Sequence, residues 1–251
     1  MPRLATYPSL QDRVALITGG ASGIGAELVR QFAQNGAQVT FIDIQDEPAN
    51  ILVQELASCR HAPRFAHCDL TDIEALRGVI GEVQEPITVL INNAGADTRH
   101  QSDEVTPDYW DRTLALNLDH QFFACQAVRS QMRDAGGGSI INLSSIAWMH
   151  GGHNVVAYSA AKAAIVGMTH SLAREYGADG IRVNAIAPGA VITPRQLDLW
   201  YSEADVDAIV ARQCLKERLL PGDIARMALF LAADDSRMIT RQCYVVDAGL
   251  R

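Results

Sequence analysis

The chain has 251 residues, of which 48% are hydrophobic, and its formal net charge is -8. That apolar fraction is enough for the core of one α/β domain. An acidic chain disfavours nucleic acid and anionic membrane surfaces as partners, because both attract basic patches. No apolar run approaches the roughly 20 residues that cross a bilayer, and residues 1–11 lack the apolar stretch of a signal peptide, so we expect a cytoplasmic protein.

Cysteine and histidine spacing gives no sign of a metal. The five cysteines lie far apart without a Cys-x-x-Cys pair, which predicts reduced thiols and no zinc knuckle. His150 and His153 are close in sequence but have no neighbouring third ligand. We therefore expect no metal site.

Short β-branched or apolar runs alternate with longer amphipathic stretches along the whole chain. The pattern predicts strands at 14–17, 38–42, 64–67, 88–91, 139–143, 181–186 and 244–246, and its clearest helices at 23–35, 47–58 and 157–176. This alternation predicts an α/β fold, a Rossmann-type doubly wound parallel sheet flanked by helices. No linker or repeat divides the sequence, so residues 1–251 are expected to form a single domain. Ligands of such sheets bind beyond the carboxyl ends of the strands.

A glycine-rich turn, TGGASGIG at residues 18–25, follows the first strand. Glycines let the backbone turn sharply, and the N-terminus of the next helix offers free N–H groups to a pyrophosphate. The spacing differs from the common Gly-x-Gly-x-x-Gly fingerprint, so a purely structural turn is the alternative. The candidate dinucleotide contacts in this turn are Gly19, Ser22, Gly23, Ile24 and Gly25.

Acidic and small residues follow the next strands. Asp43 ends the second strand 18 residues after Gly25, close to the ~20 expected for an acid that binds the adenosine ribose hydroxyls. A carboxylate there repels a 2′-phosphate and favours NAD as the cofactor, although an ordinary solvent-facing Asp is the alternative. Asp69 follows the third strand and is a candidate for binding the adenine. Residues 92–95, NNAG, let a cofactor approach the backbone after the fourth strand.

Tyr158 and Lys162 stand four residues apart and share one face of a predicted helix. A free phenol has a pKa near 10 and is a poor base at neutral pH. A cation at about 4 Å contributes roughly 4 kcal/mol at an effective dielectric of 20, or about three pKa units. Lys162 is thus expected to bring the pKa of Tyr158 near 7, where Ser145, at the end of the fifth strand, can orient a substrate oxygen against it. Asn117, in an apolar stretch, is a candidate for a water relay from Lys162 to solvent.

In these residues the sequence resembles the short-chain dehydrogenase/reductase family, from about Arg13 to Gly249. The resemblance implies a catalytic tetrad of Asn117, Ser145, Tyr158 and Lys162. It also implies a homotetramer with the helices around 110–133 and 157–176 in one interface. It extends the expected NAD contacts to Asp69, Leu70, Asn93, Ala94, Gly95, Tyr158, Lys162, Pro188, Gly189, Val191 and Thr193.

A closer resemblance is to bacterial NAD-dependent aldose 1-dehydrogenases of the D-xylose type. It rests on Tyr7–Leu10, Asp97 with Arg99 and His100, Trp148, Arg195–Gln196, Trp200–Tyr201, residues 213–216 and residues 247–251. A sugar needs several hydrogen-bond partners, since each unpaired buried hydroxyl costs about 1–3 kcal/mol. The candidate substrate contacts are Asp97, Ser145, Trp148, His150, Asn154, Gln196 and Trp200. For the two tryptophans, a role in the core or in an interface is the alternative.

The expected reaction is NAD-dependent oxidation of an aldose at C1 to the lactone, with Tyr158 as the general base. Three alternatives stay open at this point. One is a dehydrogenase of a sugar alcohol or a 2-keto-3-deoxy sugar acid, for which Arg99 or Arg195 would hold a carboxylate. The others are a 3-oxoacyl thioester reductase, which Asp43 disfavours, and a non-catalytic NAD-binding protein.

Overall fold

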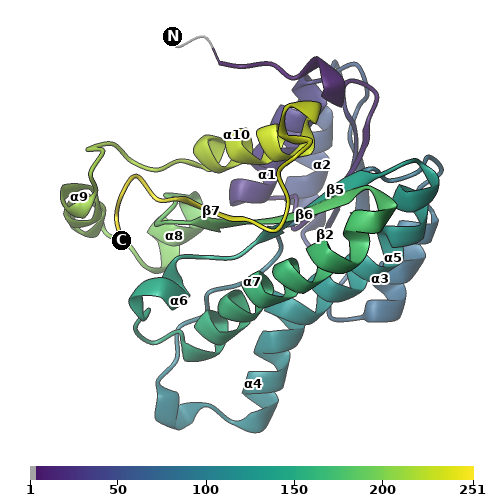
Figure 1. Cartoon of the computed structure of the whole chain (residues 1–251). Coiled ribbons are helices and arrows are strands. Elements are labelled where there is room, and N and C mark those ends of the chain that lie inside the picture. Colours follow the sequence, from purple (N-terminus) through teal and green to yellow (C-terminus); the bar gives the residue numbers. More distant parts are fainter. Residues whose placement is uncertain (1–3) are drawn as a thin grey trace.

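The computed structural model describes residues 4–251, which form one seven-stranded parallel sheet with helices on both faces (Figure 1). The strand order is β3-β2-β1-β4-β5-β6-β7. The strands are β1 (Val14–Thr18), β2 (Gln38–Asp43), β3 (Arg64–His67), β4 (Val89–Asn92), β5 (Gly138–Leu143), β6 (Ile181–Pro188) and β7 (Cys243–Val246). The predicted α/β fold and doubly wound sheet are confirmed, with every predicted strand within two residues of its observed bounds.

Two layers of helices cover the sheet. One core cluster joins the sheet to α1 (Gly23–Gln34), α2 (Asp46–Glu55) and α10 (Pro221–Ala232). The other joins it to α3 (Ile73–Gly81), α5 (His120–Asp134) and α7 (Val156–Tyr176). The remaining helices are α4 (Pro107–Leu114), α6 (Ala147–His150), α8 (Pro194–Leu199) and α9 (Glu203–Arg212).

The apolar runs predicted as strands are buried because both faces of the sheet are covered. All five residues of β1 are buried, and they alternate between the two cores. Ala15 and Ile17 point to the α1 side, and Val14 and Leu16 to the α5 side. Each fully buried aliphatic side chain of this kind contributes about 1.5–3 kcal/mol relative to an exposed one. A strand with two apolar faces cannot lie at a solvated surface.

The strand register brings the ends of β1, β2 and β4 to one edge of the sheet. Thr18 pairs with Ile42 on one side and with Asn92 on the other. The chain order reverses here, because β2 and β4 flank β1. In open α/β sheets a ligand binds in the crevice at such a reversal.

Helices α6, α8 and α9 lie beyond the carboxyl ends of the strands (Figure 1). Each of the latter two begins at a hydroxyl cap. Thr193 accepts a hydrogen bond from the Gln196 amide at 3.3 Å, and Ser202 forms a capping box with Asp205. Such caps contribute about 1 kcal/mol each. Helices α8 and α9, which follow β6 in the chain, therefore cover the edge of the sheet at which ligands bind.

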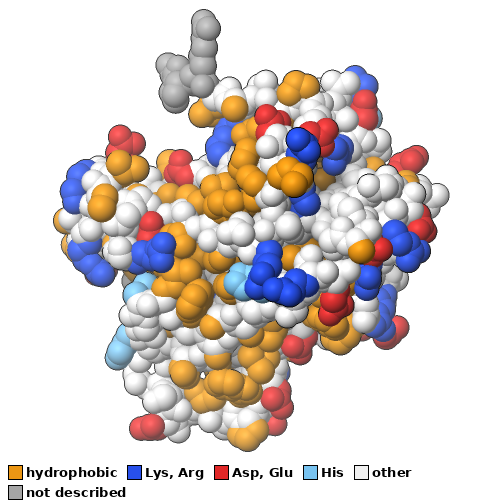
Figure 2. All heavy atoms as spheres, viewed as in Figure 1, with side chains coloured by type: hydrophobic (Ala, Val, Ile, Leu, Met, Phe, Trp, Pro, Cys, Tyr) orange, Lys and Arg blue, Asp and Glu red, His pale blue; other side chains and the backbone are white. Residues whose placement is uncertain are grey.

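On the face shown in Figure 2, basic side chains are interspersed with acidic ones, and no continuous basic surface is visible. Within residues 4–251, no helix combines the length and apolar character that a membrane span requires.

Candidate active site

One cleft of about 1060 Å³ runs along the carboxyl ends of the strands. Ligand pockets commonly span about 300–1,000 Å³, so this one has room for a large ligand. Its lining comes from the ends of β1, β2, β4, β5 and β6, from the start of α7, and from α8 and α9. All the dinucleotide contacts expected from the sequence line it, namely Gly19, Ser22, Gly23, Ile24, Gly25, Asp43, Asp69, Leu70, Asn93, Ala94, Gly95, Tyr158, Lys162, Pro188, Gly189, Val191 and Thr193.

The glycine-rich turn brings backbone to the cleft wall. A Cβ at Gly25 would lie 1.8 Å from the Gly19 carbonyl oxygen, so a side chain at this position is excluded. Ser22 is the N-cap residue of α1, and its side chain makes no cap hydrogen bond with any of residues 4–251. The first N–H groups of α1 are thus left for an anionic ligand at a position where the helix dipole favours negative charge. The turn fits a pyrophosphate.

Asp43 is nearly buried, and its carboxylate holds the wall next to this turn. One oxygen accepts the Ala21 amide at 2.9 Å, and the other accepts the amides of Ile44 at 2.8 Å and Gln45 at 3.0 Å. The Gln45 side chain adds a bond at 3.2 Å and reaches the Ser22 hydroxyl at 3.4 Å. Sequence reasoning missed Gln45, although its place two residues after Asp43 was a usable signal. The carboxylate therefore both clamps the glycine-rich turn and presents negative charge to the cleft.

Asn93 fastens β4 to the turn after β1. Its side-chain amide donates to the carbonyl oxygens of Thr18 at 3.0 Å and Gly19 at 2.9 Å. The Thr18 hydroxyl in turn accepts the amides of Asn93 at 3.0 Å and Ala94 at 3.2 Å. These bonds fix the floor on which a dinucleotide would lie.

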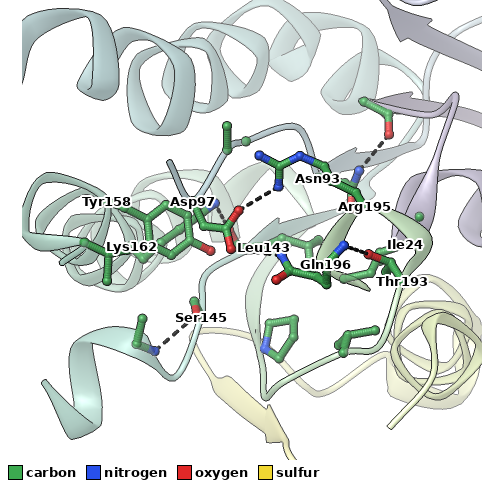
Figure 3. Close-up of a pocket in the computed structure, with 18 of the residues that line it drawn as sticks. Ile24, Asn93, Asp97, Leu143, Ser145, Tyr158, Lys162, Thr193, Arg195 and Gln196 are labelled. Carbon is green, nitrogen blue, oxygen red and sulfur yellow. Dashed lines mark hydrogen bonds and ion pairs between the residues drawn. The ribbon is translucent and has the colours of Figure 1, made fainter. Parts of the chain in front are cut away.

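Tyr158, Lys162 and Ser145 converge at the far end of the cleft (Figure 3). The Lys162 ammonium is 5.5 Å from the centroid of the Tyr158 ring and donates to the Leu143 carbonyl at 2.9 Å. Ser145 accepts the Ala147 amide at 3.1 Å, which fixes its hydroxyl at the end of β5. The structure thus brings together the three side chains that the sequence had associated.

Burial changes the acid–base properties of this pair. It raises the pKa of Tyr158 to about 12, an effect that Ser145 and Arg195 oppose and Asp97 reinforces. It also lowers the pKa of Lys162 to about 7, because desolvation disfavours the ammonium form. In the protein without cofactor, burial therefore outweighs the lowering of the Tyr158 pKa that was expected from Lys162.

Asn117 lies behind the cleft wall. It belongs to a π-helical turn, Ala115–Asp119. Such turns are frequently found at functional sites. Its side-chain oxygen accepts the Ala96 amide at 2.9 Å. A Cβ at Gly95 would lie 2.7 Å from that oxygen and 3.2 Å from the Lys162 nitrogen. Asn117 and Lys162 thus share Gly95 as a close neighbour, an arrangement that only a glycine permits.

Asp97, in the loop after β4, forms the polar wall opposite Tyr158 (Figure 3). Its two carboxylate oxygens accept bonds from Arg195 at 2.6 Å and from the Gln196 side chain at 2.9 Å. Burial alone raises the pKa of Asp97, but these two bonds and the charge of Arg195 outweigh it and leave the pKa below its usual value. Arg195 is thus engaged in an ion pair.

The other substrate candidates separate into two groups. His150 and Asn154 line the cleft together with Asp97, Ser145 and Gln196. Trp148 and Trp200 are not among the described residues that line it. Trp148 donates to the Ser144 hydroxyl at 3.2 Å. Trp200 stacks under the Arg99 guanidinium, with 4.7 Å between the guanidinium carbon and the ring centroid, and borders a smaller side pocket.

Two arginines of the lining were not predicted. Arg212 comes from α9 and Arg251 from the segment after β7. Arg212 precedes residues 213–216 and Arg251 ends residues 247–251, two stretches that carry the resemblance to aldose dehydrogenases but were assigned no role in the site. Only the fold brings these distant segments to the cleft.

Comparisons with known proteins agree with this geometry. A family model described as enoyl-(acyl carrier protein) reductase matches residues 19–251. The D-xylose 1-dehydrogenase of Caulobacter vibrioides is 47% identical over 247 residues, which are 98% of this chain and 99% of that protein. A protein of Rhizobium meliloti named "Probable galactose dehydrogenase GalD" is 45% identical over 248 residues, 97% of each chain.

Among solved structures, the crystal structure of a blue fluorescent protein from a metagenomic library, in complex with NADPH, superposes with a TM-score of 0.88. It is 36% identical, and the match covers 96% of this chain and 99% of that one. The fold, the lining of the cleft and the near-complete coverage of these relatives all point to one family. The chain belongs to the short-chain dehydrogenase/reductase family and is an oxidoreductase that acts on CH–OH groups.

Proposed function

We propose that the protein oxidises the C1 hydroxyl of an aldose to the lactone, with NAD accepting the hydride. The observation that carries this proposal is the meeting of Tyr158, Lys162 and Ser145 with the polar wall of Asp97 and Gln196 at one end of a dinucleotide-sized cleft. The names of the two relatives from Caulobacter vibrioides and Rhizobium meliloti support a sugar as the substrate.

In the proposed reaction Ser145 holds the C1 oxygen and Tyr158, as phenolate, takes its proton. The C1–H bond breaks and its electron pair leaves as hydride to the nicotinamide, while the C1–O bond becomes the lactone carbonyl. Lys162 stabilises the phenolate and Asn117 orders the water through which the proton leaves. Burial raises the pKa of Tyr158 to about 12 in the protein without cofactor, and an oxidised nicotinamide, when bound, would add positive charge that favours the phenolate.

Asp43 supports NAD over NADP. Its carboxylate lines the cleft beside the glycine-rich turn, and if the adenosine ribose binds there, a 2′-phosphate would meet negative charge at short range. We expect the wild type to bind NAD at least about tenfold more tightly than NADP, and Asp43→Ser to reduce that preference. Equal binding of the two cofactors by the wild type would contradict this assignment.

A substrate panel tests the proposal. NADH formation is followed by absorbance with aldoses, sugar alcohols, 2-keto-3-deoxy sugar acids and 3-hydroxyacyl thioesters. Oxidation of the 3-hydroxyl group of the last class is the reverse of the reaction of a 3-oxoacyl thioester reductase. Tyr158→Phe serves as the blank, and hydroxylamine traps the lactone. We expect activity with an aldose such as D-xylose or D-galactose and a trapped lactone. Activity confined to another class, or no activity in any class, would contradict the proposal.

We also infer a cytoplasmic homotetramer, as expected from the family resemblance. Exposed apolar side chains on two of the helices concerned support a subunit contact. Phe122 of α5 is 38% exposed and Val156 of α7 is 46% exposed. Light scattering after gel filtration tests the subunit number, and a monomer at micromolar concentration would contradict it.

A further inference from the structure

The Asp97 carboxylate lies between Tyr158 and Arg195 in the view of Figure 3. Its side chain is 27% exposed and that of Arg195 is 43% exposed. The two residues come from different parts of the fold, the loop after β4 and the first turn of α8. Their ion pair therefore ties the loop after β4 to α8 next to the proposed base.

Several groups face Tyr158 and Lys162 from the elements around them. Tyr158 is surrounded by Ser145 after β5, Asp97 after β4, Arg195 on α8 and Tyr201 after α8. Lys162 additionally faces the buried His120 of α5, which is neutral near pH 7. The segment between α6 and α7 adds His150 and His153 to the same cleft, and α9 and the segment after β7 add Arg212 and Arg251.

Asp97 is the carboxylate at this end of the cleft, since Asp43 and Asp69, the other acids of the described lining, follow β2 and β3 at the adenosine end. A lone carboxylate near a phenol opposes loss of the phenolic proton, and near a lysine it favours the ammonium form. The first effect works against a general base. Two donors are aimed at this carboxylate, and one of them carries a full positive charge.

We propose that Arg195 is a positioning residue that cancels the field of Asp97 at Tyr158 and Lys162, so that the carboxylate can serve as a hydrogen-bond acceptor for substrate hydroxyls without disabling the base. The inference rests on the proposed role of Tyr158. It assigns Arg195 an electrostatic task rather than contact with the substrate.

The chain offers a direct probe of this field, because Lys162 and Lys216 are its two lysines. Protein labelled with ¹³C at lysine Cε gives two side-chain NMR signals, assigned with Lys162→Met. The pKa of Lys162, about 7, lies in a convenient range for titration. This measurement needs neither cofactor nor substrate.

Arg195→Gln is expected to raise the pKa of Lys162 measurably, by about half a unit or more, because Asp97 is left unpaired. In kinetics with the best alcohol found by the panel, the rising limb of kcat/KM against pH is expected to move up by about one unit, a loss of about tenfold at a fixed pH on that limb. Arg195→Lys is expected to restore both values largely. Arg218→Gln is the matched control, since Arg218 forms an exposed pair with Glu203 outside the cleft, and both values are expected to stay in place.

The double variant Asp97→Asn/Arg195→Gln separates electrostatics from structure. It lacks the ion pair just as the single variant does, yet it has no unpaired carboxylate. We expect the titration of Lys162 and the kinetic limb to return to their wild-type positions, even if KM is higher. The proposal would be overturned if Arg195→Gln left the pKa of Lys162 and the kinetic limb unchanged. It would also be overturned if the double variant shifted both as far as Arg195→Gln does. If the panel finds no substrate, the proposed function fails while the Lys162 titration still decides the role of Arg195.

Discussion

The ammonium of Lys162 lies 5.5 Å from the ring centroid of Tyr158 and donates to the Leu143 carbonyl at 2.9 Å, and the residue as a whole is only 3% exposed. Burying an ammonium disfavours its charged form, which is why the pKa of Lys162 falls to about 7. The lysine that we propose to assist Tyr158 is thus buried at a cost in stability. Active sites commonly retain such unfavourable arrangements.

Lys162→Met is therefore expected to stabilise the protein while abolishing oxidation of the substrate. The unfolded chain binds a proton at lysine up to about pH 10.4, whereas the folded chain releases it near pH 7. Between these values the stability of the wild type rises with pH. The variant removes this dependence, and urea unfolding at pH 7.5 should show a gain of about 2 kcal/mol.

Lys216→Met is the control for that experiment, because Lys216 is exposed and bonds only to backbone oxygens among the described residues. Its stability and the pH dependence of its unfolding should match those of the wild type. A Lys162→Met protein less stable than the wild type at pH 7.5 would show that the lysine's contacts outweigh its desolvation.

Tyr158→Phe should lower kcat by about 10³-fold, since it removes the only proton acceptor proposed for the alcohol. The benzene ring is kept, so NAD binding measured by calorimetry should stay close to that of the wild type. Tyr109→Phe is a matched control that removes a phenol bonded to His100 at 2.9 Å outside the described cleft lining. An active Tyr158→Phe protein would rule out this tyrosine as the base.

Periodicity and turn residues were sufficient to predict the sheet. The predicted strand at 14–17 is observed as Val14–Thr18, and the predicted helix at 157–176 as Val156–Tyr176. The positions of Asp43, Asn93, Ser145 and Tyr158 at strand ends or on the next helix follow from parallel topology alone, because the carboxyl ends of parallel strands share one edge. That is why the site could be assembled from local patterns.

Other features depend on contacts between distant segments. Trp200 was a candidate substrate contact with a core or interface role as the alternative, and the contact of Arg99, from the loop after β4, with its ring could not be predicted from the sequence. The Leu143 carbonyl that holds Lys162 is a backbone atom and has no sequence signature. The shifts in the pKa values of Tyr158 and Lys162 could not be predicted, because burial depends on packing that a sequence motif does not reveal.

Gly25→Ala should damage both the fold and cofactor binding. The new methyl would have to lie 1.8 Å from the Gly19 carbonyl oxygen, so the turn would shift and carry the first amides of α1 with it. We expect a loss of about 2 kcal/mol in unfolding free energy and at least about tenfold weaker NAD binding. Differential scanning calorimetry and titration calorimetry measure the two effects.

Gly78→Ala in α3 is the matched control, because the Cβ it would add meets no described atom within 4 Å beyond its chain neighbours and the helix's own backbone. Alanine is favoured over glycine inside a helix by about 1 kcal/mol, so this variant should be more stable and bind NAD normally. Equal tolerance of both substitutions would contradict the close approach in the glycine-rich turn.

His120 should make the protein sensitive to acid. Its side chain is fully buried, and neither ring nitrogen has a hydrogen-bond partner within residues 4–251. Burial and, to a smaller extent, the charge of Lys162 lower the pKa of His120 to about 3, and the nearby backbone of Ala94 and Leu116 opposes this only in part. Between pH 6.5 and 3 the unfolded chain therefore binds a proton at this residue that the folded chain rejects, and stability falls as the pH falls, by up to about 1.4 kcal/mol per unit.

His120→Gln removes this titrating group, so the difference in unfolding free energy between wild type and variant should change by about 2 kcal/mol in the variant's favour from pH 7 to pH 5. His67→Gln is the control, because His67 is exposed and pairs with Asp46 at 2.8 Å. Urea unfolding at closely spaced pH values measures both differences. If the unfolding free energies of the wild type and of His120→Gln change in parallel across this pH range, the folded protein accommodates a charged imidazole beside Lys162. The low dielectric assumed around His120 would then be wrong.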